Sequence, residues 1–388
     1  MKPPATHSAR APYRLLCLHT SAGGGHTSAM KAIIEAIEDR YGDQVEIDLV
    51  DALKEYAPKP LDLAPEAYST MIKAPQLYKQ FFYGLGDGRR RSRVVMQAIT
   101  LYSRRGVAAL LGEHPADMII STYHFASSPV LDALTRSNGK HIPVITVVTD
   151  LVTLPPVWFD ERADLTILPT EPAYHQGIIA GMKPERLRRI GLPVSPRFVP
   201  VADKAAVRKK LGWPTNKMVV LLMAGGAGVG PLGSLAEAII SSGLEILPVI
   251  ITGKNHRLSQ RLRKQSWANE AVIYDFVDDM PAFMQAADVL ITKAGPGTIT
   301  EALNVNLPMI LYSRIPGQEE GNVEYVTYTG AGYWAPKKTE LIATLRYLAS
   351  DPDGLKQAAQ ACKALARPGA ADSIAKVVMQ RLRQTVGD

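Results

Sequence analysis

The sequence predicts an α/β protein made of two domains, each with a parallel β-sheet. Three observations support this prediction. Short apolar runs of strand length alternate with segments of helical spacing along both halves of the chain. A proline cluster at Pro193, Pro196 and Pro200 separates the two halves. The chain has 388 residues, of which 46% are hydrophobic, which is enough for two or three domains with sizeable cores. We expect two Rossmann-like domains that face each other.

The first half opens with strand, turn, helix and strand. Residues 13–19 are a short apolar run, and Gly23, Gly24 and Gly25 follow it. Apolar residues then recur at helical spacing over 27–40, before a second strand at 45–50. After a helix-rich segment at 53–111, further strands are expected at 118–122, 143–149 and 165–168.

The second half repeats this alternation. Its expected strands are 218–223, 246–252, 272–274, 289–292 and 309–312. A closing helix is expected at 371–383, and we expect it to cross back to the N-terminal domain. The resulting domains are an N-terminal domain at 1–195 with a helix-rich segment at 53–111, a C-terminal domain at 196–366, and a crossing helix at 367–388.

Charge and composition limit the class of partner. The net charge of +7 and the pI of about 9.2 favour anionic partners. No zinc-finger spacing or RNA-binding aromatic motif is present, so we expect no nucleic acid. Cys17 and Cys362 lie at opposite ends of the chain and belong to no metal-ligand spacing. No apolar run reaches the roughly 18 residues of a spanning helix. These features predict a cytoplasmic protein that is soluble or peripheral.

The first glycine-rich turn is a candidate ligand site. Gly23, Gly24 and Gly25 lie between a strand and a helix, at the sheet edge where ligands bind. His26 follows at the helix start, and its ordinary pKa near 6.5 suits a general base. The turn and His26 are equally compatible with a tight turn and a helix cap.

A second glycine cluster at 224–230 also follows a strand and opens a helix. Backbone N–H groups and the helix dipole make such a turn an anion site, which suits a diphosphate. Residues 228–233 fit the G-x-G-x-x-G pattern of dinucleotide-binding proteins. The following strand ends at Thr252, Gly253, Lys254 and Asn255 without a carboxylate, which disfavours a nicotinamide-dependent dehydrogenase.

Two further clusters follow strands in the second half. The run 288–303 passes from a strand through a small-residue turn into a helix that begins near Gly297. Glu301 lies one turn into this helix, where it can accept hydrogen bonds from vicinal hydroxyls or simply complement the dipole at the surface. The loop 316–322 groups Gln318, Glu319 and Asn322, which suit sugar hydroxyls or an ordinary polar loop.

The order of these motifs resembles the monogalactosyldiacylglycerol synthase and processive diacylglycerol glucosyltransferase family. These are GT-B enzymes of glycosyltransferase family 28, in which the two domains face each other across a cleft. The resemblance implies that 1–195 is the acceptor (lipid) domain, with the acceptor turn at 23–25 and a membrane-facing segment at 53–111, and that 196–366 is the donor domain, which binds the UDP-sugar. The resemblance spans about residues 13–375. The matching stretches are 21–26, 148–151 with Trp158 and Phe159, 191–193, 222–230, 288–303 and 316–326.

The resemblance implies roles for individual residues. Phe276 and Val277 would bracket uracil, and Glu301 would hold the ribose hydroxyls. His26 would be the base, with Asp150 as rival or orienter. The diphosphate would be lined by Gly225, Gly226, Gly295, Gly297 and Thr298, and the hexose would be held by Gln318, Glu319 and Asn322. Where the family pattern leads us to expect an arginine directly after 191–194, Ser195 and Pro196 precede Arg197.

The resemblance also implies the reaction. A hexose, with galactose favoured over glucose, would pass from a UDP-sugar co-substrate to diacylglycerol with inversion, without a cofactor or metal. Another lipid-linked glycosyltransferase of the peptidoglycan type, a UDP-sugar 2-epimerase and a non-enzymatic nucleotide-sugar sensor remain as alternatives.

A lipid acceptor requires contact with a membrane. Arg89, Arg90, Arg91 and Arg93 form a basic run next to Phe81, Phe82 and Tyr83. Basic residues bind an anionic leaflet, and aromatic side chains settle at its interface. The segment is expected to hold the protein on the inner face of the membrane, although a solvated loop beside a core patch has the same composition.

Overall fold

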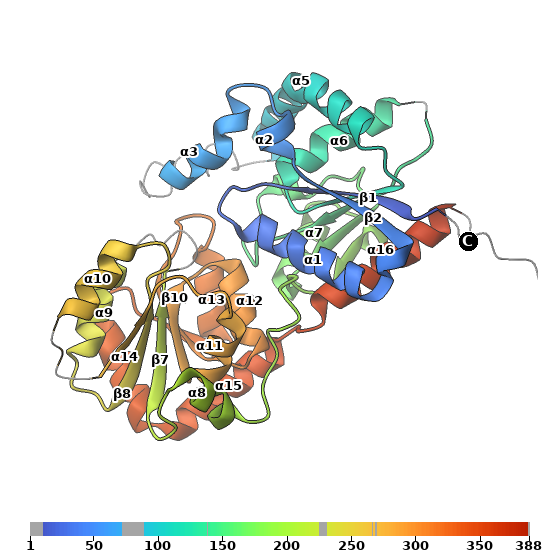
Figure 1. The fold of residues 1–388 in the computed structure, drawn as a ribbon. Helices are drawn as coiled ribbons and strands as arrows, with labels where there is room; N and C mark the ends of the chain where they lie inside the picture. The colour runs from blue at the N-terminus through green and yellow to red at the C-terminus, as the bar shows by residue number, and fades with distance from the viewer. Residues whose placement is uncertain are drawn as a thin grey trace, which may run out of the picture.

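The chain folds into two α/β units, which Figure 1 shows one above the other. The structure is a computed structural model, and it describes residues 11–71, 89–137, 139–224, 231–265, 267 and 270–386. The turn at 225–230, with Gly225 and Gly226, lies outside these residues, as do Phe81, Phe82 and Tyr83.

The first sheet is parallel throughout its described pairs, with the order β2-β1-β3-β4-β5-β6. Five of its strands were predicted, and the sixth escaped prediction because three residues at a sheet edge carry no readable period. The strands are β1 (Tyr13–His19), β2 (Val45–Asp51), β3 (Met118–Ser121), β4 (Val144–Val147), β5 (Leu165–Leu168) and β6 (Leu187–Arg189).

Helices cover both faces of this sheet. Helix α1 packs its apolar stripe, which includes Ile33 and Ile37, on one face, and α6 packs on the other. The α-helices are α1 (Gly25–Tyr41), α2 (Ala52–Tyr56), α3 (Ala64–Met71), α5 (Arg89–Glu113), α6 (His124–Arg136) and α7 (Glu171–Ile179). The 3-10 helices are η1 (Gly42–Gln44), η2 (Leu61–Leu63), η3 (Pro156–Trp158) and η4 (Pro184–Arg186).

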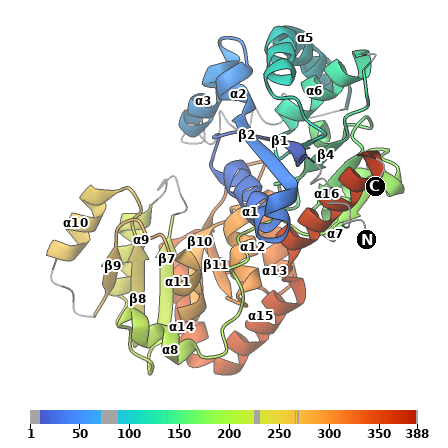
Figure 2. The same cartoon turned by 45° about the vertical axis from the view of Figure 1, so that its right-hand side comes forward.

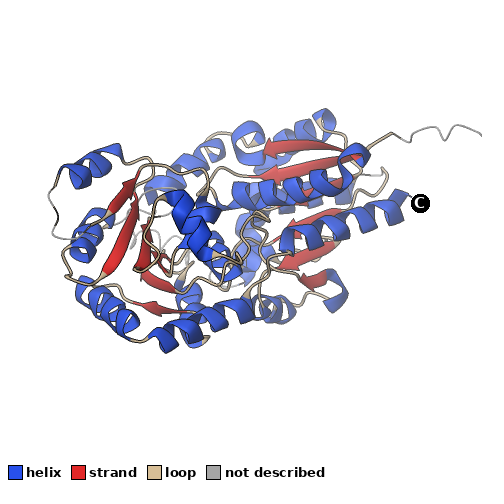
Figure 3. Ribbon diagram, turned by 60° about the horizontal axis from the view of Figure 1, so that its bottom comes forward, coloured by secondary structure: helices blue, strands red, loops and turns tan. Residues whose placement is uncertain are grey.

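The second sheet is also parallel, with the order β12-β11-β10-β7-β8-β9. Its strands are β7 (Met218–Met223), β8 (Ile246–Ile251), β9 (Val272–Tyr274), β10 (Val289–Lys293), β11 (Met309–Ser313) and β12 (Gly332–Trp334). Only the short edge strand β12 was not predicted. The helices are α8 (Lys204–Leu211), α9 (Leu232–Ile240), α10 (His256–Lys264), α11 (Met280–Ala286), α12 (Pro296–Asn304), α13 (Glu320–Tyr328), α14 (Lys338–Ser350) and α15 (Pro352–Leu365). Figure 3 shows the two sheets with helices around them.

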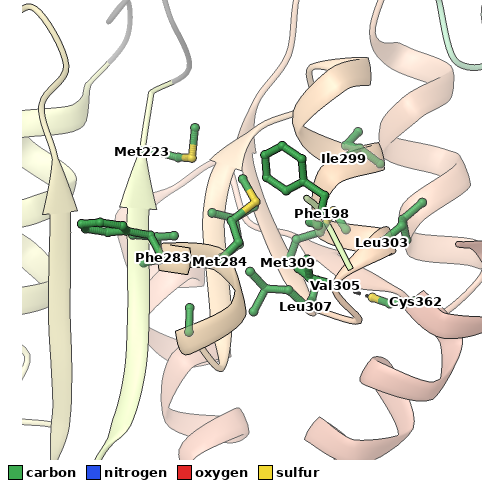
Figure 4. Close-up of a cluster of buried hydrophobic side chains, with 14 of the residues drawn as sticks. Phe198, Met223, Phe283, Met284, Ile299, Leu303, Val305, Leu307, Met309 and Cys362 are labelled. Carbon is green, nitrogen blue, oxygen red and sulfur yellow. Dashed lines mark hydrogen bonds between the residues drawn. The ribbon is translucent and has the colours of Figure 1, made fainter. Parts of the chain in front are cut away.

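The linker between the sheets is part of a hydrophobic core. Phe198 of the linker packs with residues of β7, α11, α12 and β11 (Figure 4). Leu151 and Leu192, from the first half of the chain, belong to the same cluster. The two units therefore share apolar contacts, which fixes the linker against the second sheet.

The closing helix α16 (Ala370–Val386) returns to the first unit, as predicted, and lies beside α1 in Figures 1 and 2. Its Ile374 and Val378 enter the core under the first sheet. Asp372 accepts a hydrogen bond from Arg40 Nε over 2.8 Å. The chain therefore passes from α15, which packs on α12 of the second unit, to α16, which packs on α1 of the first unit. The proposed boundaries at residues 195 and 366 remain a prediction.

Each sheet has one topological switch point, where the strand order reverses and later strands are added on the other side of the first strand. This point lies between β1 and β3 in the first sheet and between β7 and β10 in the second. Ligands of open parallel sheets bind outside the carboxyl ends of the strands at such points. The turn 20–24 and the turn 294–295 occupy these positions, which directs attention to His26 and to the start of α12.

Candidate active site

The turn before α1 leaves open space in front of its backbone. Gly23 and Gly24 have φ angles of 73° and 75°, a conformation that favours glycine. A Cβ added at Gly24 or Gly25 would meet no atom within 4 Å. The glycines therefore shape the turn and also let another molecule approach the main chain.

His26 is held in one orientation by its Nδ1 atom. Nδ1 lies 2.8 Å from the carbonyl oxygen of Thr122 and 2.7 Å from Oγ1 of Thr149. A carbonyl can only accept, so Nδ1 carries the proton, and the lone pair of the neutral ring is on Nε2. Burial lowers the pKa of His26 below 6.5, although the charge of Asp150 opposes this shift. The ring is thus neutral at pH 7, as a general base must be. The structure gives His26 no helix-capping bond.

Asp150 is buried and has both oxygens engaged. Its Oδ2 accepts a hydrogen bond from Trp158 Nε1 over 2.7 Å, and its Oδ1 accepts one from Gln318 Nε2 over 2.9 Å. Desolvation by burial raises the pKa of Asp150 above its ordinary value, although these two donors and the charge of His26 oppose the rise. The two donors hold the carboxyl group in one orientation, which suits a group that orients its neighbours. This geometry favours His26 over Asp150 as the base.

Aromatic rings surround His26, and sequence reasoning had given them no role. The ring of Tyr123 lies edge-on to His26 with centroids 5.0 Å apart, and the ring of Trp158 lies 6.3 Å away. His124 stands against Trp158 at 4.7 Å, and burial lowers the pKa of His124 to about 3. The signal in the sequence was that Tyr123 and His124 directly follow a strand at the sheet edge.

The donor side is built around the first turn of α12. Gly295 is its N-cap, and helix geometry leaves the N–H groups of Gly297 and Thr298 without intrahelical acceptors. A Cβ at Gly297 would meet no atom within 4 Å. Lys293, which sequence reasoning had not assigned, ends β10 beside Gly295 and adds positive charge. A diphosphate fits this combination of dipole, cation and open space.

The loop 316–322 is more buried than an ordinary polar loop. Glu319 is 2% exposed; its Oε1 accepts from Lys293 Nζ over 2.7 Å and its Oε2 accepts from the N–H of Ile315 over 2.8 Å. Asn322 Nδ2 donates to the carbonyl oxygen of Ala294 over 2.9 Å, and its buried Oδ1 has no hydrogen-bond partner. Glu319 and Asn322 therefore hold the donor turn in place, and Gln318 reaches across to Asp150.

Glu301 is half-buried, one turn into α12. Desolvation raises its pKa to about 7. A carboxyl in this state needs hydrogen-bond donors to become charged, and a pair of vicinal hydroxyls supplies them. Phe276 and Val277 follow β9; Phe276 is 61% exposed, and Val277 packs against the core. Arg197 forms an ion pair with Asp279 over 2.5 Å.

The acceptor and donor elements lie against each other. Helix α1, which carries His26, contacts α12, which carries Glu301. The N–H of Gly321 donates to Thr153 Oγ1 over 3.2 Å, next to the bond between Gln318 and Asp150. Of the predicted residues, the structure thus places Gln318 against Asp150, and it places the helices that carry His26 and Glu301 in contact.

The predicted membrane residues lie at the start of α5. Arg91 and Arg93 are exposed, whereas the side chains of Arg89 and Arg90 lie outside the described residues. The described helices include none with the length and apolar character to cross a bilayer. Within the same residues, no group of three or more His, Cys, Asp or Glu side chains could hold a metal ion.

Comparison with known proteins identifies the family of the chain. Residues 26–194 match the family model of monogalactosyldiacylglycerol (MGDG) synthase, and residues 232–374 match the C-terminal domain of glycosyltransferase family 28. The chain is 35% identical to a probable monogalactosyldiacylglycerol synthase of Nicotiana tabacum over 96% of its own length and 71% of that protein. It is 34% identical to monogalactosyldiacylglycerol synthase 1 of Arabidopsis thaliana, over 85% and 63%.

The fold is shared with a solved bacterial enzyme. MurG of Acinetobacter baumannii superposes with a TM-score of 0.62 at 12% identity, over 95% of this chain and all of that one. Such a distant match concerns the fold alone, which is GT-B. From the two family models and the relatives, the chain belongs to the monogalactosyldiacylglycerol synthase family and is a UDP-sugar-dependent hexosyltransferase.

Proposed function

We propose that the protein transfers a hexose, with galactose favoured, from a UDP-sugar to the hydroxyl of 1,2-diacylglycerol. The product would be a β-linked monoglycosyldiacylglycerol. The observation that carries the proposal is the state of His26: its Nδ1–H is committed to the Thr122 carbonyl, so Nε2 is the basic atom at the acceptor turn. The names of the relatives supply the lipid and the sugar.

The reaction is a single displacement. The oxygen of the lipid hydroxyl attacks the anomeric carbon, while Nε2 of His26 takes its proton. The bond between that carbon and the diphosphate oxygen breaks, and UDP leaves with the electron pair. Attack opposite the leaving group inverts the configuration, from an α-linked donor to a β-linked product. The transition state resembles the oxocarbenium ion of glycoside hydrolysis.

The donor side would stabilise the leaving group. Charge that develops on the diphosphate meets the free N–H groups at the start of α12 and the ammonium group of Lys293. Glu301 would accept from the ribose hydroxyls, with Phe276 and Val277 beside the uracil. The family resemblance would add Gly225 and Gly226, which lie outside the described residues, to the diphosphate site.

The acceptor domain would meet the membrane through α5. Arg91 and Arg93 share the start of this helix with Val94, which is 64% exposed, and further along Leu101 and Tyr102 are 60% and 54% exposed. Exposed apolar and basic side chains on one helix suit the surface of an anionic leaflet. We propose a peripheral location on the inner face of the membrane.

A product assay tests this function. The purified protein is incubated with diacylglycerol in liposomes and with either UDP-galactose or UDP-glucose, and the lipid product is identified by mass spectrometry and proton NMR. We expect a β-galactolipid. A β-glucolipid would instead assign the diacylglycerol glucosyltransferase branch. Consumption of the UDP-sugar without any lipid product would overturn the proposal and favour an epimerase.

A further inference from the structure

The carboxylate of Asp150 lies where the two halves of the molecule meet. Asp150 belongs to the acceptor unit and accepts a hydrogen bond from Trp158 of the same unit. It also accepts a hydrogen bond from Gln318 of the donor unit. Because Asp150 is only 6% exposed, these bonds form away from bulk water. A buried hydrogen bond to a charged group contributes more than a neutral one.

The contact around this bond is tight. Gly321 lies three residues after Gln318, in the first turn of α13, and donates its N–H to Thr153. A Cβ at Gly321 would stand 2.5 Å from Thr153 Oγ1 and 2.9 Å from Val152 Cγ1. The first turn of α13 is therefore seated directly on the acceptor loop 150–153.

The same turn is tied to the donor site. Glu319 pairs with Lys293 at the end of β10, and Asn322 donates to the carbonyl oxygen of Ala294, so both residues hold the turn between β10 and α12. A displacement of the donor turn would therefore move Gln318 and Gly321 as well.

On the other side, Asp150 is tied to the base. Thr149, its neighbour in the chain, places Oγ1 2.7 Å from His26 Nδ1. Trp158, which donates to Asp150, has its ring 6.3 Å from the ring of His26. Three successive contacts thus connect the donor turn, Asp150 and His26.

We propose that Asp150 is a positioning residue that docks the donor loop on the acceptor domain, so that its hydrogen bond with Gln318 aligns the donor sugar with His26. This inference rests on the proposed sugar transfer for its kinetic readout. It gives Asp150 no proton-transfer step and gives Gln318 a role beyond contact with the hexose.

An exchange of the two side-chain types tests the docking. Q318E places two carboxylates against each other, and we expect kcat to fall about 30-fold. In D150N/Q318E, the oxygen of the introduced amide can accept from Trp158 while its nitrogen donates to the introduced carboxylate, so the bond is rebuilt with the direction reversed. We expect the double variant to recover at least about tenfold of kcat over Q318E, with UDP affinity within about threefold of wild type. The matched control Q357E, on the exposed face of α15, should behave as wild type.

A second readout separates positioning from general damage. The charge of Asp150 raises the pKa of His26, whose other titratable neighbours are His19 and His124, and Glu319 with its partner Lys293 lies near Asp150. D150N should therefore move the acidic limb of kcat/KM to lower pH. A merely structural role would lower activity without moving that limb.

A third readout needs no substrate. Small-angle X-ray scattering of the full chain should give a larger radius of gyration for Q318E, and the double variant should return to the wild-type value. If the wild-type protein makes no glycolipid, the proposed function is wrong, but the radii of gyration of wild type, Q318E and the double variant still test whether the loop docks on the acceptor domain. Independent effects of D150N and Q318E would multiply in kcat and would add in the radius of gyration. That result would overturn the docking role.

Discussion

The two halves of the proposed active site differ in the chemical groups that form them. On the acceptor side these groups are side chains: His26 is fixed by Thr122 and Thr149, and aromatic rings lie beside it. On the donor side, the main chain does most of it, through the start of α12 and glycines with open space. Proton transfer requires a single atom in one tautomer, whereas diphosphate binding requires only several donors that converge on the ligand.

The largest expected effect is on the acceptor side. H26A removes the base, and kcat should fall about 10²–10⁴-fold, whereas UDP affinity should stay within about threefold. Steady-state assays with diacylglycerol liposomes and titration calorimetry with UDP measure the two quantities. H175A, at an exposed histidine of α7, is the matched control and should keep full activity. Near-normal turnover in H26A would show that His26 is not the base and would contradict the role given to the acceptor side.

The next effect concerns the membrane, which only the acceptor half is expected to meet. Each basic residue near an anionic leaflet contributes about 1 kcal/mol, so R91A/R93A should weaken binding to anionic vesicles about 30-fold. Vesicle sedimentation at low and high salt measures this. The control K338A/R346A removes two positive charges from α14 of the donor half and should bind as wild type. Equal losses in both double variants would point to net charge instead of α5.

A third change probes the donor backbone. G297A puts a methyl group into the space at the start of α12, and UDP should bind about tenfold more weakly because the diphosphate can no longer approach the main chain. Alanine also favours helix, so the melting temperature should not fall. G112A in α5, another helical glycine with open space, is the control for propensity alone. Unchanged UDP affinity in G297A would place the diphosphate elsewhere.

A fourth change links donor binding to stability through Glu301. Its pKa is raised from 4.5 to about 7, so between these values the folded state keeps a proton that the unfolded state releases. Stability is therefore lost as the pH rises through this window. E301Q should raise the free energy of unfolding by on the order of 2 kcal/mol at pH 8 and change it little at pH 4. Urea unfolding at both pH values measures this.

The same variant should bind UDP about tenfold more weakly at pH 8, because an amide accepts less strongly than a carboxylate from ribose hydroxyls. Weaker binding without greater stability would contradict the desolvated state of Glu301. Greater stability of E301Q without weaker UDP binding would show that the ribose does not bind at Glu301.

Much of the fold could be read from apolar periodicity. Strands such as β1 and β7 were predicted with correct ends because buried parallel strands are continuous apolar runs. The edge strands β6 and β12 were missed because three residues show no period and draw their stability from one neighbour. Of the proposed site, the residues on glycine-rich turns could be predicted, since such turns mark sheet edges. Thr149 and Lys293 were given no role because their partners, His26 and Glu319, lie 123 and 26 positions away in the sequence. Trp158 bonds to nearby Asp150, but its place beside the ring of His26 could not be predicted from the sequence.

The two parallel sheets, the turns at their carboxyl edges and the family could be predicted, because they depend on local periodicity and on residue types at fixed spacing, which a linear chain displays. The tautomer of His26, the raised pKa of Glu301 and the bond between Gln318 and Asp150 could be seen only in the folded chain. Hydrogen bonding and desolvation depend on which groups meet in space, and here residues 96 and 168 positions apart are brought together.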